Sequence, residues 1–197
     1  MRPCKNLPEG YEKIFKIDLS GDKRLFLLVN LGAALIAILM VALVLPFKSI
    51  SMLFDMSSGM GIYALRFSVI IAGSVVYIIL HELIHGLFFR LYSGERAFYG
   101  FKLSYAYAGS NWFYDKKRYL VIALSPVIIW GVVLSALCVV IPKDFFWSVY
   151  FIQIMNISGA AGDLYVTYKM LRLPPDILVR DTGTSMEIFS RSTNKSV

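Results

Sequence analysis

Four long apolar stretches, separated by shorter polar segments, dominate the pattern of this 197-residue chain. They cover residues 25–45, 63–92, 119–141 and 145–171. A helix needs about 20 consecutive apolar residues to cross a hydrocarbon core roughly 30 Å thick. Because that core offers the backbone no hydrogen-bond partners, each stretch is predicted to be a membrane-spanning α-helix.

Polar segments outside these stretches show patterns that are typical of β-strands. Residues 98–107 alternate aromatic with small or polar side chains and lie between glycines. Residues 177–180 and 186–189 flank the sequence Asp-Thr-Gly-Thr, which favours a hairpin turn. The predicted fold class is therefore an all-α membrane protein, with about four transmembrane helices and a small cytoplasmic β element.

The basic residues predict how the helices are oriented. Seventeen of the twenty Lys and Arg residues lie before the first stretch, at the end of the second or between it and the third, or at the end of the fourth and beyond it. Such an excess marks the cytoplasmic segments of membrane proteins. We therefore expect a multi-pass protein of the cell membrane with both termini in the cytoplasm. Arg66, near the outer end of the second stretch, is expected to extend to the lipid headgroups.

The same pattern divides the chain into three parts. Residues 1–24 are predicted to be a cytoplasmic arm, residues 25–172 a four-span domain, and residues 173–197 a cytoplasmic tail. Residues 93–118 form a cytoplasmic segment between the second and third spans. The arm mixes acidic with basic residues and lacks the features of a cleavable signal, so the first span is expected to be retained.

Composition narrows the classes of function. Hydrophobic residues make up 57% of the chain and charged residues 17%, against about 45–50% and 25% in soluble domains. The net charge of +7 is accounted for by membrane topology, so we expect no nucleic-acid partner. Cys4 and Cys138 are too few for a disulfide framework or a thiolate metal site. The expected partners are the lipid bilayer and a membrane protein or peptide, and the sequence does not indicate an oligomeric state.

Both histidines of the chain lie in the second stretch, in the sequence His-Glu-Leu-Ile-His at residues 81–85. In a helix, His81 and His85 project from one face, and this spacing allows two imidazoles to bind one metal ion. Glu82 is placed to act as general base towards a metal-activated water. Ionisable groups within a span cost roughly 2.5–3.5 kcal/mol each, which favours a functional role. The alternative is a polar cluster that joins helices.

Asp163 is the predicted third ligand, because catalytic zinc usually takes three protein ligands and a water. Apart from Glu82, it is the carboxylate that lies deep in a predicted span. His85 lies five residues before Arg90, and Asp163 six before Lys169, so the two should lie at one depth in the membrane. The alternative for Asp163 is a helix cap or an ion pair.

Asn156 lies seven residues before Asp163, which is two turns of a continuous helix. Its amide could orient a substrate carbonyl or stabilise an oxyanion. An ordinary hydrogen bond between helices explains Asn156 equally well. The small residues at positions 158–162 would allow two helices to approach closely.

Together these motifs resemble a family of small membrane proteins named "putative zincin peptidase", which is similar to the site-2 protease clan of intramembrane zinc metalloproteases. The resemblance implies that His81, His85 and Asp163 bind zinc, that Glu82 is the general base, and that Asn156 orients the substrate.

The likeness covers about residues 75–185. Site-2 proteases typically carry an Asn followed by Pro and then Leu-Asp-Gly. In this chain Gly precedes Asp163, Leu follows it, and no proline lies between Asn156 and Asp163.

The predicted function is that of an integral membrane zinc metallopeptidase, which hydrolyses peptide bonds of membrane-associated proteins with Zn2+-activated water. Residues 98–107 could bind such a substrate by edge pairing. The first alternative is a zinc-binding scaffold or regulator that cleaves nothing, and the second is a metal transporter. Four spans without repeat symmetry make the transporter the weakest of these hypotheses.

Overall fold

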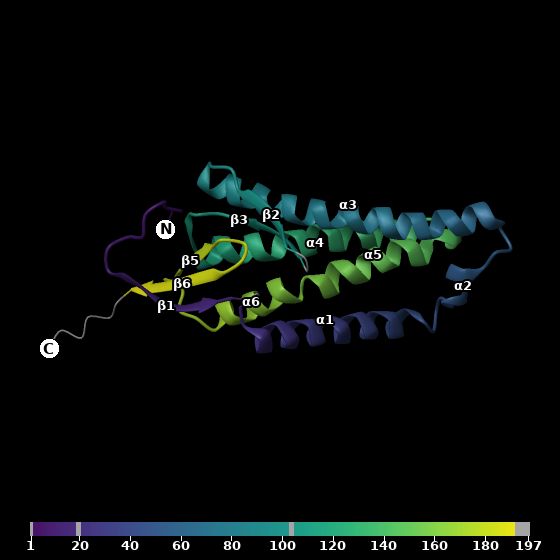
Figure 1. The fold of residues 1–197 in the computed structure, drawn as a ribbon, viewed down its shortest axis with the longest axis horizontal. Coiled ribbons are helices and arrows are strands. Elements are labelled where there is room, and N and C mark those ends of the chain that lie inside the picture. Colours follow the sequence, from purple (N-terminus) through teal and green to yellow (C-terminus); the bar gives the residue numbers. More distant parts are fainter. Residues whose placement is uncertain (1, 19–20, 103–104, 192–197) are drawn as a thin grey trace. The chain divides into compact units, whose positions relative to one another are not determined.

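The computed structural model describes residues 2–18, 21–102 and 105–191. Its helices and strands are labelled in Figure 1. In chain order they are β1 Tyr11–Ile17, α1 Lys23–Val44, α2 Ser51–Phe54, α3 Met60–Ser93, β2 Phe98–Lys102, β3 Tyr105–Gly109, β4 Phe113–Asp115, α4 Lys116–Val140, the 3-10 turn Lys143–Phe145, α5 Phe146–Gly159, α6 Ala161–Leu171, β5 Leu178–Asp181 and β6 Met186–Arg191.

The chain forms two compact units. The first, here called the sheet unit, comprises Met1–Leu27, Glu82–Ser125 and Asp163–Val197. The second, the helix unit, comprises Leu28–His81 and Pro126–Gly162. Helices α1, α3 and α4 each continue without a break from one unit into the other.

Among the residues that the structure describes, three helices are long and apolar enough to cross a membrane, namely α1, α3 and α4. No residue of α1 is buried, and large side chains such as Leu35 and Leu43 are exposed along it. A helix that exposes apolar side chains all along its length suits a lipid environment better than water. The structure therefore indicates a mostly helical membrane protein, as the sequence predicts.

The fourth apolar stretch differs from the prediction of a single helix. Helix α5 ends at Gly159 and α6 begins at Ala161, because Ala160 leaves the helical conformation at φ −76° and ψ 11°. The 14 residues of α5 and the 11 of α6 are about 21 and 17 Å long, and each is too short to span a bilayer alone. Glycine on either side of two alanines weakens a helix at this point, which apolar periodicity does not reveal.

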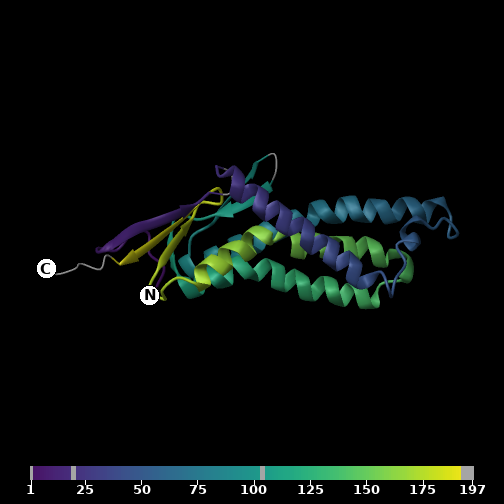
Figure 2. The same ribbon diagram turned by 90° about the horizontal axis from the view of Figure 1, so that it is seen from below.

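A four-stranded antiparallel sheet lies in the sheet unit, with the strand order β1-β6-β5-β4. The predicted hairpin is confirmed as β5 and β6, with Gly183 at a φ of 72° in its turn. Strand β1 comes from the segment that the sequence analysis treats as an arm, and it pairs with β6 from Tyr11 opposite Arg191 to Ile17 opposite Met186. Figures 1 and 2 both show β1 beside β6, at opposite ends of the chain.

A separate two-stranded sheet occupies the segment predicted to be strand-like at residues 98–107. It is a hairpin of β2 and β3, in which Phe98 lies opposite Gly109 and Lys102 opposite Tyr105. Residues 103–104 of the predicted strand lie outside the described part of the chain. The prediction of strand structure is therefore confirmed for the described residues, which form two short strands.

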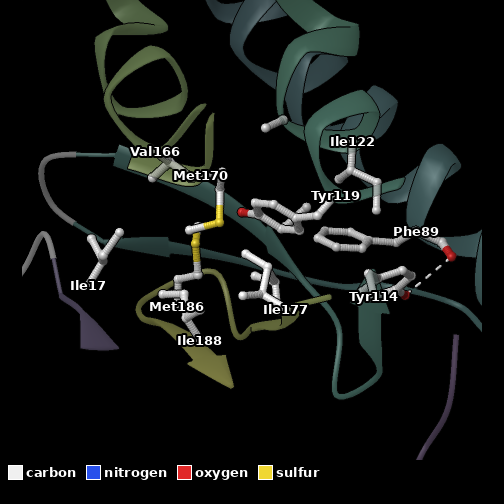
Figure 3. Close-up of a cluster of buried hydrophobic side chains, with 13 residues drawn as sticks. Ile17, Phe89, Tyr114, Tyr119, Ile122, Val166, Met170, Ile177, Met186 and Ile188 are labelled. Carbon is white, nitrogen blue, oxygen red and sulfur yellow. Dashed lines mark hydrogen bonds between the residues drawn. The ribbon is translucent and has the colours of Figure 1, made fainter. Parts of the chain in front are cut away.

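The core of the sheet unit joins the four-stranded sheet to the helices. Figure 3 shows that side chains from separate elements converge there, among them Phe89 of α3, Tyr119 of α4 and Ile188 of β6. The Tyr119 hydroxyl also donates a hydrogen bond to the carboxylate of Asp181, the last residue of β5. Burial raises the pKa of that carboxyl above its usual range.

The helix unit contains a fully buried arginine. Arg66 donates hydrogen bonds to the carbonyl oxygens of Met52 (3.1 Å) and Asp55, and its Nη2 lies 3.2 Å from the Asp144 carboxylate. The prediction that Arg66 extends to the headgroups is therefore wrong. Met52 of α2, Asp55 directly after it and Asp144 of the 3-10 turn supply acceptors to the buried guanidinium, and Asp144 is 78 positions away in the sequence.

We predict that Ile188→Ala destabilises the sheet unit, because Ile188 is fully buried and its truncation leaves a cavity. The expected loss in the free energy of unfolding is about 2–5 kcal/mol. The matched control is Ile14→Ala, since Ile14 is 48% exposed on β1. Chemical unfolding in detergent, followed by near-ultraviolet circular dichroism, measures both variants. Equal losses for the two would contradict the packed core.

Candidate metal centre

Helix α3 carries three of the predicted site residues. His81 and His85 are buried, and Glu82 is half-buried. The boundary between the two units falls between His81, in the helix unit, and Glu82, in the sheet unit. Helix α3, Met60–Ser93, is continuous across this boundary. The positions of these three residues relative to one another therefore follow from a single helix, in which residues four apart share a face.

His85 is held by the backbone of α4. Its Nδ1 lies 2.9 Å from the carbonyl oxygen of Ile122. A carbonyl oxygen only accepts hydrogen bonds, so Nδ1 carries the hydrogen and donates it. The lone pair needed for a metal is then on Nε2, as in histidine ligands whose other nitrogen is anchored.

Asp163 lies beside that same nitrogen. Its Oδ2 is 3.7 Å from His85 Nε2, which is too long for a hydrogen bond. Two ligand atoms that each lie about 2.0–2.1 Å from a tetrahedral zinc are roughly 3.3 Å apart, so the observed separation suits a shared ion. Asp163 lies in the first turn of α6, where the helix dipole stabilises a negative charge.

His81 completes the donor set. One ligand atom from each of His81, His85 and Asp163 can be chosen so that all three lie within 4.8 Å of one another. Two imidazoles and one carboxylate are a known ligand set of catalytic zinc, which leaves the fourth position for water or substrate. The residues present therefore fit a zinc ion.

The second nitrogen of His81 has a partner within the helix unit. His81 Nδ1 lies 2.9 Å from the Tyr77 hydroxyl, one turn earlier on α3. That hydroxyl donates in turn to Asn156 Oδ1 over 3.1 Å.

Asn156 is fully buried, and its amide is already engaged. Its Nδ2 donates to the carbonyl oxygen of Val127 (3.2 Å) and to Gln153 Oε1 (3.3 Å), while its Oδ1 accepts from Tyr77. The expectation that Asn156 and Asp163 share a helix face fails, since the helix is interrupted at Ala160. These contacts favour the alternative, a hydrogen bond between helices, over the orientation of a substrate.

Sequence reasoning missed Tyr77 and Gln153. Both carried a weak local signal, because Tyr77 lies one turn before His81 and Gln153 three residues before Asn156. Tyr99 was missed as well. A Cβ atom on Gly86 would lie 1.9 Å from the Tyr99 hydroxyl, so β2 packs against α3 immediately after His85.

A protein family described as "Putative zincin peptidase" matches this chain over residues 74–178, a range that includes every predicted site residue. The protein named "Uncharacterized 24.7 kDa protein in gap 5'region" from Pyrococcus woesei is 31% identical over 118 residues. That match covers 57% of this chain and 51% of the relative, so the chain spans about half the length of the curated relative it matches. No solved structure matches the chain.

We predict that the purified protein binds one zinc ion per chain, and that His81→Ala, His85→Ala and Asp163→Ala each abolish this binding. Loss of a ligand should weaken binding by more than the ~10–100-fold caused by loss of an outer-shell partner. Asp176→Ala is the control, since Asp176 is exposed. Elemental analysis after dialysis against a weak chelator measures the zinc content. Full zinc content in Asp163→Ala would exclude this carboxylate as a ligand.

Proposed function

Because this chain belongs to the family described as "Putative zincin peptidase", we propose that it is an integral membrane zinc endopeptidase that cleaves membrane-associated proteins. Family membership supports a metallopeptidase in general. One observation supports the more specific proposal of a zinc site with a general base. His85 Nε2 lies 3.7 Å from Asp163 Oδ2, and His85 is one turn of α3 from Glu82.

Each site residue has a role in this proposal. His81 and His85 would bind zinc through Nε2, and Asp163 through a carboxylate oxygen. Zinc at this position would polarise the scissile carbonyl and lower the pKa of a water towards neutrality. Glu82 would take a proton from that water and deliver it to the leaving amine. Its position next to His81 in sequence keeps the base within one turn of both imidazoles.

The location within the membrane is part of the proposal. The motif lies in α3, one of the three helices suited to cross a bilayer. Basic residues gather at both ends of the chain and around the connection from α3 to α4, including the adjoining ends of these helices, which supports cytoplasmic termini and a site in the cytoplasmic half of the membrane. A substrate there would have to be extended, because an intact helix buries its own peptide bonds.

The hairpin of β2 and β3 could receive such an extended segment. Within the described part of the chain β2 pairs with β3 and with no further strand. An edge of this kind can pair with a peptide backbone. The packing of Tyr99 against Gly86 keeps β2 next to the helix that carries Glu82 and His85. A substrate strand added to this hairpin would therefore run near the proposed ligands of the sheet unit.

We predict that Glu82→Gln keeps the zinc and loses proteolysis. A glutamine cannot accept the proton, so the rate of cleavage should fall by about 100-fold to 10,000-fold. The matched control is Glu95→Gln, because Glu95 lies on an exposed loop and pairs with Lys5. Mass spectrometry of membrane proteins from cells that produce each variant would identify fragments with new N-termini.

Three results would separate the hypotheses. Fragments made by the wild type and Glu95→Gln, and absent with Glu82→Gln, support the peptidase. A zinc-loaded wild type that generates no fragments, in cells whose phenotype Glu82→Gln still rescues, supports a scaffold. Zinc flux into liposomes that contain the purified protein supports a transporter.

A further inference from the structure

Hydrogen bonds between buried side chains connect helices α4 and α5 to His81 on α3, all within the helix unit. The series begins at the Gly131 carbonyl of α4 and continues through the side chains of Gln153, Asn156 and Tyr77. Its successive distances are 3.1, 3.3, 3.1 and 2.9 Å. The direction of each bond can be derived from the hydrogens that each group carries.

The amide of Gln153 is oriented by α4. Its Nε2 lies 3.1 Å from the carbonyl oxygen of Gly131 and 3.0 Å from the Ser135 hydroxyl. A carbonyl oxygen needs a donor, so the amide nitrogen must be on that side. Gln153 Oε1 therefore points the other way, where it accepts a hydrogen bond from Asn156 Nδ2.

The amide of Asn156 is oriented by two acceptors. Its Nδ2 has two hydrogens, and they are donated to Gln153 Oε1 and to the carbonyl oxygen of Val127. Its Oδ1, which has no hydrogen, must then face the Tyr77 hydroxyl at 3.1 Å. The single hydrogen of that hydroxyl is donated to Asn156, so the Tyr77 oxygen can only accept from His81.

We propose that this relay fixes the tautomer of His81, with the hydrogen on Nδ1 and the lone pair on Nε2, where a metal can use it. Tyr77, Asn156 and Gln153 are then positioning residues, which act on the site through His81. The inference rests on the proposed metal site. It explains why fully buried Asn156 is tolerated among apolar helices, because a buried amide is costly unless each of its groups is paired.

The relay also explains a difference between the two histidines. His85 donates to a backbone carbonyl, which is present whatever side chain Ile122 carries. His81 depends on three side chains, so its tautomer can be altered by mutation. An imidazole without such a partner can populate both tautomers and can rotate about its side-chain bonds, and both effects weaken metal binding.

Nuclear magnetic resonance of the metal-free protein tests the tautomer directly. The chain contains two histidines, so 15N-histidine labelling of the full chain in detergent, with a histidine-free purification tag, gives two imidazole spectra. His85→Gln assigns them. We expect the Nδ1-protonated pattern for the His81 ring in the wild type, and the His85 ring, whose Nε2 faces the Asp163 carboxylate, serves as the internal reference. Tyr77→Phe should convert His81 to a mixed or Nε2-protonated pattern and leave His85 unchanged.

Zinc affinity provides the second measurement. Competition with a chelator should show binding that is roughly 10–100-fold weaker in Tyr77→Phe. Asn156→Leu should also weaken binding, and Asn156→Asp should restore part of it, because a carboxylate still accepts from Tyr77. The matched control is Tyr150→Phe. Tyr150 donates a partly buried hydrogen bond to the Met40 carbonyl in the same unit, outside the relay, so the zinc affinity of Tyr150→Phe should equal that of the wild type.

The outcomes separate this inference from the proposed function. An unchanged His81 spectrum in Tyr77→Phe overturns the relay, whatever the protein cleaves. A changed spectrum supports the relay even if Glu82→Gln shows that the protein is no peptidase. Equal losses of zinc affinity in Tyr77→Phe and Tyr150→Phe would mean that Tyr77 affects the site only through the packing of the helices. That result would also overturn the proposal.

Discussion

The hydrogen bonds that His81 and His85 make through Nδ1 are the interactions on which the site depends. An imidazole binds a metal only through a nitrogen without a hydrogen, so the partner of one nitrogen decides whether the other is available. His85 donates to the Ile122 carbonyl and His81 to the Tyr77 hydroxyl, both at 2.9 Å. Each ring is thus anchored from the side away from the proposed ion. The spacing of the histidines on α3 would be of little use without these two anchors.

Burial of polar groups among apolar helices sets a second constraint. Arg66 and Asn156 are both fully buried in the helix unit. Each group of the Asn156 amide is paired, and Arg66 is paired through Nη1 and Nη2, although its Nε has no partner among the described residues. Such contacts offset the cost of placing polar groups among apolar helices. The partners of Arg66 are the carbonyl oxygens of Met52 and Asp55 and the Asp144 carboxylate, so this cluster joins separate segments of the chain. One partner of Asn156 is Tyr77, whose hydroxyl also contacts His81, so this cluster links the packing of the helices to the proposed metal site.

Local pattern was sufficient to predict the parts of the fold that depend on neighbours in sequence. The helical spacing of His81 and His85, the hairpin of β5 and β6, and three long apolar helices all follow from residues a few positions apart. Family resemblance, confirmed over residues 74–178, added the expectation of zinc. Asp163 could be named from the sequence because few carboxylates lie within apolar stretches.

The features that the sequence did not reveal depend on long-range pairing or on small energy differences. Strand β1 pairs with β6 across almost the whole chain, and its own pattern of charged residues does not suggest a strand. The interruption at Ala160 occurs where glycines at positions 159 and 162 weaken the helix, between two helices of ordinary composition. That interruption also invalidates the two-turn argument for Asn156. Its true partners could be found only once Tyr77 and Gln153 were placed in space.

Charge balance gives a reason why this ligand set suits a site between apolar helices. Two neutral imidazoles, the carboxylates of Asp163 and Glu82, and one divalent cation carry no net charge together. A net charge in such surroundings would cost several kcal/mol, so a balanced set is favoured over one with an extra anion or cation. The anchors on His81 and His85 contribute by orientation, because each turns Nε2 of its ring towards the place where a cation would take the position of a second proton. The hydrogen bonds therefore set the geometry of the proposed site, and the cation would set the charge of its ligands.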